Sequence, residues 1–275
     1  MLVDSHAHLD FPELSRDLDA ILERAQKAGV SRILSISTTL ESAARTVDLA
    51  RQFPSIGATV GVHPCYVDQV GQSEEILPAL RTLAEQLEVV AIGEIGIDYH
   101  RSPRPPEDIQ AHSAWENNRA LQKRFFEQQL QLAVELGLNV VVHQRDSWED
   151  TLKILRPYAG KLRAVFHCFG GTLQQAHELL DLGFLVSFTG IVTFKNATSV
   201  HECATRLPKG AFFLETDCPF LAPVPHRGKR CEPAHTRLIA EQIAHLRGES
   251  LHQLALHTTE AAELFFRRAR PPIPA

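Results

Sequence analysis

Short apolar segments alternate with helical segments along almost the whole chain, and this alternation restricts the possible folds more than any other feature. The apolar segments are nearly continuously hydrophobic, which is typical of strands buried on both faces in a parallel sheet. The segments between them carry hydrophobic residues three and four positions apart, as amphipathic helices do. We expect eight strands, the first leading into His6 and the others at Arg32–Ser37, Ile56–Val62, Val89–Ile95, Leu138–His143, Arg163–His167, Phe184–Phe188 and Ala211–Thr216.

The predicted helices have the boundaries that glycine and proline usually impose. The first stops at Gly29, which suits a left-handed helix end, and the second stops before Pro54. The segment Tyr99–Pro106 is rich in proline and arginine, so we expect a long loop there. The helices are predicted at Glu13–Ala28, Leu40–Gln52, Ser73–Leu87, Trp115–Leu136, Ser147–Leu155, Thr172–Asp181, Asn196–Arg206, Pro233–Arg247 and Ser250–Arg267.

Eight strands that alternate with helices predict an α/β protein whose parallel sheet closes into a (β/α)8 TIM barrel. The alternative is an open doubly wound sheet, which would need a glycine-rich phosphate turn after an early strand. The sequence contains no such turn, and its 275 residues match one barrel of about 250 residues. With 44% hydrophobic residues, the chain has enough apolar surface for one large core. We therefore expect a single barrel domain over residues 1–267, followed by a mobile tail at residues 268–275.

Residue types that bind metals stand where the predicted strands end. In an α/β barrel the carboxyl ends of the strands form the active-site face. The first strand ends in His6 and His8, and side chains two positions apart on a strand point the same way. One such residue alone would be an ordinary polar strand end, but several at one barrel mouth predict a metal site. The residues at these ends are His6, His8, His63, Glu94, His143, His167, Glu215 and Asp217.

Charge and cysteine content restrict where the protein acts and what it binds. A formal net charge of -5 argues against nucleic-acid binding over a broad surface, so a polyanion would need a local cluster of Arg and Lys. The five cysteines are scattered and form no C-x-x-C motif, which indicates free thiols in a reducing compartment. The sequence shows neither a signal peptide nor an apolar run long enough for a membrane helix. We therefore expect a cytoplasmic protein that does not bind membranes.

Six short motifs accompany these strand ends: Asp4-Ser-His6-Ala-His8-Leu, Gly61-Val-His63-Pro, Gly93-Glu94-Ile-Gly-Ile-Asp98-Tyr, His143-Gln-Arg145-Asp, His167-Cys-Phe and Glu215-Thr-Asp217-Cys-Pro. A seventh, Leu221-Ala-Pro-Val-Pro-His226-Arg-Gly-Lys-Arg230 followed by Glu232-Pro, comes after the last predicted strand. The set resembles the TatD family of metal-dependent deoxyribonucleases over nearly the whole chain. The resemblance implies an amidohydrolase-like barrel that hydrolyses phosphodiester bonds with the help of metal ions.

Matched position by position, the family pattern implies two divalent metal ions and a bridging carboxylate. One ion would be held by His6, His8, Glu94 and Asp217, and the other by Glu94, His143 and His167. Two such ions can activate water and stabilise a departing oxygen. Asp217 would also orient or deprotonate the attacking water, which makes Asp217 and Glu94 the catalytic candidates. Histidine and carboxylate ligands suit Zn²⁺ or Mn²⁺, and the resemblance also admits Mg²⁺.

Other residues are predicted to support the ligands or to bind the substrate. Asp4 and Glu215 share strand parity with ligands. Their carboxylates either accept hydrogen bonds from imidazole N–H groups or are buried without catalytic effect. Phosphate binding requires cations near the metals, and the proline-stiffened loop after the last strand supplies several. The predicted substrate-binding residues are His63, Arg145, His226, Arg227, Lys229 and Arg230.

Together these features predict a deoxyribonuclease whose substrate is the end of a single-stranded DNA or a small nucleotide. A hydrolase of a small amide, lactone or phosphotriester is the alternative, because it would share the metals without needing a guanidinium cluster. A metal-binding protein without turnover is a further alternative. The open coordination positions that the ligand set leaves for water argue against it.

Overall fold

The computed structural model describes residues 1–70, 76–100 and 108–267. The predicted tail at residues 268–275 and most of the predicted loop Tyr99–Pro106 lie outside the described residues. Within the described ranges, no helix is both long enough and apolar enough to cross a membrane.

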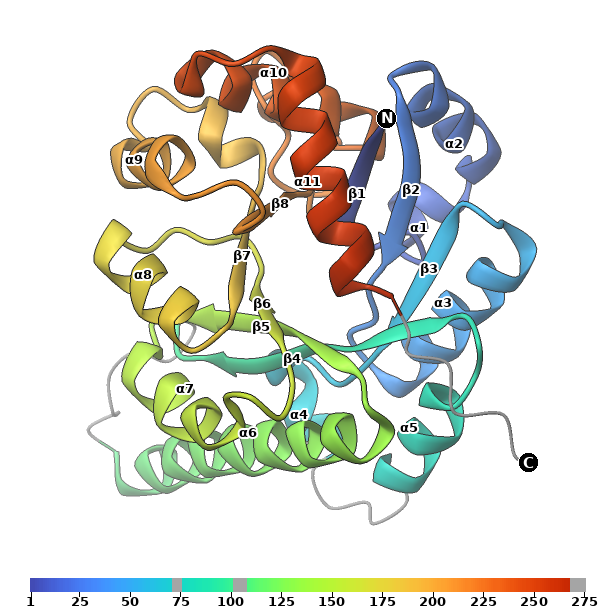
Figure 1. Ribbon diagram of the computed structural model, residues 1–275. Helices are drawn as coiled ribbons and strands as arrows, with labels where there is room; N and C mark the ends of the chain where they lie inside the picture. The colour runs from blue at the N-terminus through green and yellow to red at the C-terminus, as the bar shows by residue number, and fades with distance from the viewer. Residues whose placement is uncertain (71–75, 101–107, 268–275) are drawn as a thin grey trace, which may run out of the picture.

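Eight strands form one parallel sheet in which each strand pairs with the next along the chain. The backbone N–H of Asp217 donates to His6 O (2.9 Å), and that of His8 donates to Cys218 O (2.8 Å), which nearly closes the ring. Helices surround this sheet (Figure 1), and the predicted (β/α)8 barrel is confirmed. The strands are β1 (Leu2–Ala7), β2 (Val30–Ser35), β3 (Ile56–Val60), β4 (Val89–Asp98), β5 (Asn139–Arg145), β6 (Ala164–Phe166), β7 (Leu185–Phe188) and β8 (Phe212–Leu214).

Local capping interactions fix the ends of several helices. Thr39 accepts a hydrogen bond from Ser42 N at the start of α3, and Thr172 and Gln175 cap the start of α8 reciprocally. Gly137, with a left-handed φ of 63°, ends α6. The helices are α1 (Pro12–Ser15), α2 (Leu18–Lys27), α3 (Leu40–Gln52), α4 (Val67–Val70), α5 (Ile76–Ala84), α6 (Ile109–Leu136), α7 (Trp148–Leu155), α8 (Leu173–Asp181), α9 (Thr198–Arg206), α10 (Thr236–Arg247) and α11 (Leu251–Phe265).

Two helices differ most from their prediction at the N-terminal end. The predicted helix Glu13–Ala28 is divided into α1 and α2, because Asp17 leaves the helical region with φ -132° and ψ 34°. Helix α6 begins at Ile109 and not at Trp115, because the Asp108 side chain accepts a hydrogen bond from Ala111 N and caps the helix earlier. In both cases one polar residue set the boundary, whereas the prediction had followed the apolar periodicity.

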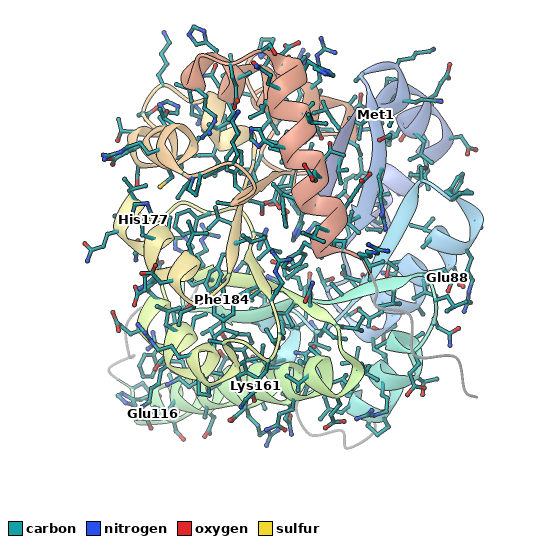
Figure 2. All side chains as sticks on the ribbon, viewed as in Figure 1. Met1, Glu88, Glu116, Lys161, His177 and Phe184 are labelled. Carbon is teal, nitrogen blue, oxygen red and sulfur yellow. The ribbon has the colours of Figure 1, made fainter. Side chains whose placement is uncertain are left out.

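Hydrophobic cores lie on both faces of the sheet. The larger core packs the strands against the surrounding helices and includes the fully buried Phe184, whereas Glu116 and His177 point outward at the periphery (Figure 2). The smaller core lies inside the ring, where the Phe213 and Phe265 ring centroids are 5.2 Å apart. Because Phe265 ends α11 and its carbonyl bonds to Asn139 at the start of β5, α11 closes the amino end of the barrel. The opposite, carboxyl end carries the polar groups.

Candidate metal centre

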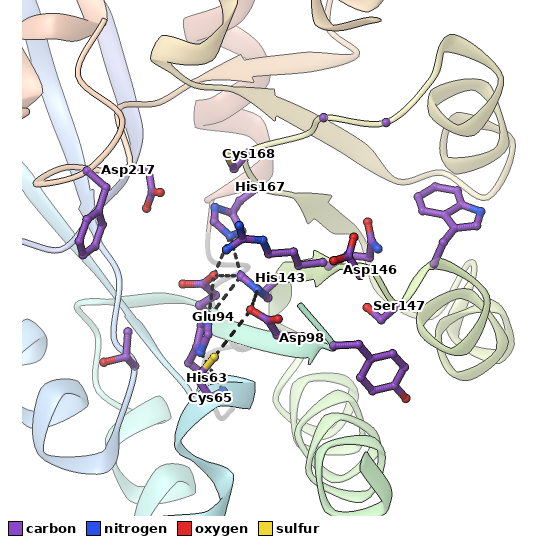
Figure 3. Close-up of a pocket in the computed structure, with 18 of the residues that line it drawn as sticks. His63, Cys65, Glu94, Asp98, His143, Asp146, Ser147, His167, Cys168 and Asp217 are labelled. Atoms are coloured by element: carbon purple, nitrogen blue, oxygen red, sulfur yellow. Dashed lines mark hydrogen bonds and ion pairs between the residues drawn. The ribbon is translucent and has the colours of Figure 1, made fainter. Parts of the chain in front are cut away.

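The carboxyl ends of the strands surround a cavity of about 1100 Å³. Figure 3 shows His63, Glu94, His143 and His167 converging in this cavity, with Asp217 entering from the segment after β8. His8 also lines the cavity, and His6 is fully buried beside it. The structure thus brings together all six residues predicted as metal ligands: His6, His8, Glu94, His143, His167 and Asp217.

Glu94 lies at the centre of this cluster, and its two carboxylate oxygens face different imidazoles. Oε1 lies 2.6 Å from His167 Nε2 and 2.8 Å from His143 Nδ1. Oε2 lies 3.4 Å from His6 Nε2 and 4.0 Å from His8 Nε2. Burial alone would raise the pKa of Glu94, but the surrounding histidines hold it well below its usual range. The ionised carboxylate therefore presents one oxygen to each of two groups of ring nitrogens.

Asp217 forms a further group of ligand atoms with His6 and His8. Its Oδ1 lies 3.3 Å from His8 Nε2 and 3.6 Å from His6 Nε2. The other ring nitrogen of His8, Nδ1, contacts Ile36 O at 3.1 Å, which fixes the ring with Nε2 toward the carboxylate. Asp217 has a φ of 57°, a conformation uncommon for residues other than glycine, and its backbone N–H is held by His6 O.

Buried nitrogen atoms without partners show that a cation fits among these residues. Neither ring nitrogen of His6 has a hydrogen-bond partner in the part of the chain that the structure describes. His143 Nδ1 and His167 Nε2 lie 3.1 Å apart beside the same carboxylate oxygen. A buried polar atom left without a partner costs about 1–3 kcal/mol, and a bound cation would remove that penalty at the one ring nitrogen of neutral His6 that carries a lone pair. Imidazole nitrogens mixed with carboxylate oxygens are a donor set suited to a divalent metal.

His63, which was predicted to bind phosphate, lies among the candidate ligands. Its Nε2 is 3.6 Å from Glu94 Oε1 and 3.3 Å from His143 Nδ1. Burial lowers the pKa of His63 to about 3 even though Glu94 lies nearby, so the ring is neutral at neutral pH. Because His63 Nδ1 accepts a hydrogen bond from Cys65 N (3.0 Å), the neutral ring carries its proton on Nε2, where it can donate one hydrogen bond to a phosphate but supplies no positive charge.

Asp98 is a site residue that the sequence reasoning missed. Its Oδ2 lies 3.0 Å from His143 Nε2 (Figure 3), which leaves His143 Nδ1 turned toward Glu94. Burial would raise the pKa of Asp98, but the hydrogen bond with His143 lowers it to about 2. A signal was present, because Asp98 stands four residues after Glu94 on the same strand and therefore on the same face.

Asp4 and Glu215 support the backbone around the ligands. Asp4 accepts hydrogen bonds from Thr216 N (2.9 Å), Thr216 Oγ1 (2.6 Å) and His6 N (3.3 Å). Glu215 accepts from Ser187 Oγ and Cys168 N, both at 2.6 Å, and lies 3.7 Å from His167 Nδ1. Both carboxylates thus join the ends of neighbouring strands, and Glu215 also lies beside His167 Nδ1, the ring nitrogen that does not contact Glu94.

The predicted substrate-binding cations do not all reach the cavity. Arg145 lines it, as does His63, but the four residues of the loop after β8 are not among the described residues that line it. The Arg230 guanidinium forms a two-pronged ion pair with Asp17 (2.9 and 3.0 Å), which joins this loop to the start of α2. The other three residues lie in the same loop. Arg227 lies over the ring of Phe194, His226 stacks on His235, and Lys229 is exposed.

A parallel barrel with histidines and carboxylates converging at its carboxyl-end mouth is the architecture of metal-dependent hydrolases. The chain belongs to the TatD related DNase family, whose model matches residues 3–267. The family predicted from the motifs is thereby confirmed.

Similar proteins agree with this assignment. The uncharacterized metal-dependent hydrolase YabD of Bacillus subtilis is 38% identical over 97% of this chain and 99% of its own length. The 3'-5' ssDNA/RNA exonuclease TatD of Erwinia tasmaniensis is 35% identical over 96% of this chain and 99% of its own. The crystal structure of YJJV, a TatD homolog from Escherichia coli K12, matches with a TM-score of 0.85 at 29% identity and covers 96% of this chain and 97% of that chain. The chain is therefore a metal-dependent hydrolase of this family.

Proposed function

We propose that the protein is a nuclease that hydrolyses phosphodiester bonds of single-stranded DNA ends or of small nucleotides. The observation that carries this proposal is the position of Glu94, whose two oxygens face separate groups of ring nitrogens. That arrangement suits two cations sharing one carboxylate, which is common in enzymes that cut phosphate esters. The name of the Erwinia tasmaniensis relative, which specifies single-stranded nucleic acid, supports the same substrate class.

The ligand groups divide between two divalent metal ions, Zn²⁺, Mn²⁺ or Mg²⁺. By their distances to the two oxygens of Glu94, His6, His8 and Asp217 would hold one ion, His143 and His167 the other, and Glu94 both. When bound, such ions activate a water nucleophile at neutral pH and neutralise charge on the phosphate. Asp98 fixes the ring of His143, so that the ligating nitrogen stays directed at Glu94.

Asp217 and Arg145 would act on the nucleophile and on the substrate. The Asp217 carboxylate faces the cavity next to His8, where it can orient the attacking water and accept its proton. The exposed Arg145 side chain lines the same cavity and forms no ion pair with a carboxylate of the described residues. Its guanidinium can therefore donate paired hydrogen bonds to a phosphate of the substrate.

Stripping the metal and adding single cations back tests this function. The chelated protein should not cut a labelled single-stranded oligonucleotide, and Mg²⁺, Mn²⁺ or Zn²⁺ should restore cutting with shortened products on a gel. The same preparations should be assayed on a small amide, a lactone and a phosphotriester. Metal-dependent turnover of one of these substrates without any cutting of DNA would replace the proposed function by that alternative.

A further inference from the structure

The cavity has a second cationic region away from the ligands, where α6 meets the end of β4. Arg119 on α6 lines the same cavity as Glu94. Its guanidinium carbon lies 3.6 Å from the ring centroid of Tyr99 and 4.1 Å from that of Trp115. Two aromatic faces therefore hold this one guanidinium by cation–π contact.

The aromatic support of Arg119 is itself fixed. Tyr99 is 5% exposed, and its hydroxyl donates to Asp150 Oδ2 at 2.7 Å. Lys123 binds the same carboxylate oxygen at 2.7 Å, so the charge of Asp150 is already paired. The Tyr99 ring that contacts the guanidinium is thus held in place on the wall of the cavity. Ligand binding at Arg119 therefore requires little further ordering of side chains.

The N–H groups of Arg119 remain available to a ligand. Stacking uses the faces of the guanidinium and leaves its hydrogen-bond donors in the plane. Arg119 forms no ion pair with any carboxylate that the structure describes, and its buried Nε has no hydrogen-bond partner there. The positive charge of Arg119 thus has no anionic partner among the described residues, and a phosphate oxygen is the acceptor that best fits a guanidinium fork.

The size of the cavity leaves room for more than one nucleotide. Its volume of about 1100 Å³ exceeds the range of about 300–1,000 Å³ that is typical of sites for single small molecules. The ligand cluster and Arg119 stand on the ends of different elements around it. The cavity can therefore hold two phosphates of one strand, one at the ligand cluster and another at Arg119.

We propose that Arg119 binds a second phosphate of a nucleic-acid strand whose scissile phosphate lies at the metal ligands. The substrate is then an oligonucleotide, and a mononucleotide or dinucleotide occupies only part of the site. This inference rests on the proposed nuclease function and decides between the two substrate classes named there. Arg119 acts as a specificity-determining residue and takes no part in the cleavage step itself.

Trithymidylate substrates test the second phosphate directly. One substrate has two natural linkages, and two others each have one linkage replaced by a neutral methylphosphonate. For the wild-type protein in its activating cation, kcat/KM for the natural substrate should exceed that for the better neutral-linkage substrate about tenfold or more, as expected for one hydrogen bond to a charged group. In Arg119→Gln and Arg119→Met this preference should fall to about twofold, the statistical factor for two cleavable linkages.

A control variant and the salt dependence complete the test. Arg206→Gln removes a positive charge from α9, where Arg206 is exposed and paired with Glu202, and it should keep the wild-type preference. The slope of log KM against log salt should fall by about 0.7 in the Arg119 variants, as expected for one lost phosphate contact on a single strand. If either folded Arg119 variant kept the full preference, the role of Arg119 would be refuted while the nuclease function stood. If the wild-type protein cut none of the three substrates, the nuclease function would fail, and with it the role of Arg119.

Discussion

Replacing Glu94 with glutamine should remove bound metal, whereas replacing Asp217 with asparagine should mainly remove activity. Glu94 has ring nitrogens of five histidines within 4.0 Å, divided between its two oxygens. Glu94→Gln replaces one of those oxygens by an NH₂ group, which cannot ligate a cation and removes the negative charge that both ions would share. We therefore expect this variant to bind fewer than two metal ions per chain.

Asp217 reaches only one of the two ligand groups, so its replacement has a different consequence. In Asp217→Asn the ligands His6, His8 and Glu94 remain in place, so most of the metal should stay bound. The loss of a general base should lower kcat at least about 10²-fold. That change corresponds to about 2.7 kcal/mol in activation free energy, at 1.36 kcal/mol for each factor of ten.

Elemental analysis of the purified variants, together with steady-state rates on a single-stranded oligonucleotide, separates the two outcomes. Glu249→Gln is a matched control. It neutralises a largely buried glutamate that pairs with Arg247 (2.7 Å) and His257 (3.1 Å), none of which lines the cavity. This control should keep both the metal and kcat. Two metal ions per chain in Glu94→Gln, or near wild-type turnover in Asp217→Asn, would refute the shared-carboxylate site.

Three further predictions follow from other contacts. Asp98→Asn should weaken metal affinity by about 10–100-fold in a metal titration, because His143 loses the partner that orients its ring, and unchanged affinity would refute that role. Changing Arg227, Lys229 and Arg230 together to Ala should weaken DNA binding and flatten its salt dependence. Arg230→Ala alone should lower Tm without changing the dependence of DNA affinity on salt, because Arg230 already pairs with Asp17. Burial would raise the pKa of Glu249, but His257 and Arg247 lower it below the ordinary 4.5. Its contribution to stability is therefore present above that value and is lost as the pH falls through the folded pKa. The Tm difference between the wild type and Glu249→Gln should accordingly shrink at acidic pH, and a constant difference would contradict this assignment.

Much of the fold and of the site could be predicted from the sequence, because the relevant signals are local. The alternation of apolar and amphipathic segments predicted the eight strands and the barrel, and the structure confirms both. Strand parity placed His6 and His8 on one side, and the barrel rule placed Glu94 and His143 at the same mouth, where the structure has them. These inferences needed only the identity of a residue and its position on its own strand.

Contacts between residues far apart in the sequence depend on closure of the barrel, so no local sequence pattern could predict them. Arg230 belongs to a cationic run and was predicted to bind phosphate. Its partner in the structure is Asp17, 213 residues away, and this ion pair holds the loop against the start of α2. Arg119 resembled any other cation on a helix until the fold placed it against Tyr99 on the cavity wall. The sequence by itself determined which residues could bind metal and at which end of the barrel they stand. Only the tertiary structure decided which charges are paired and which remain available to a ligand, because pairing depends on the distance between side chains brought together by different strands and helices.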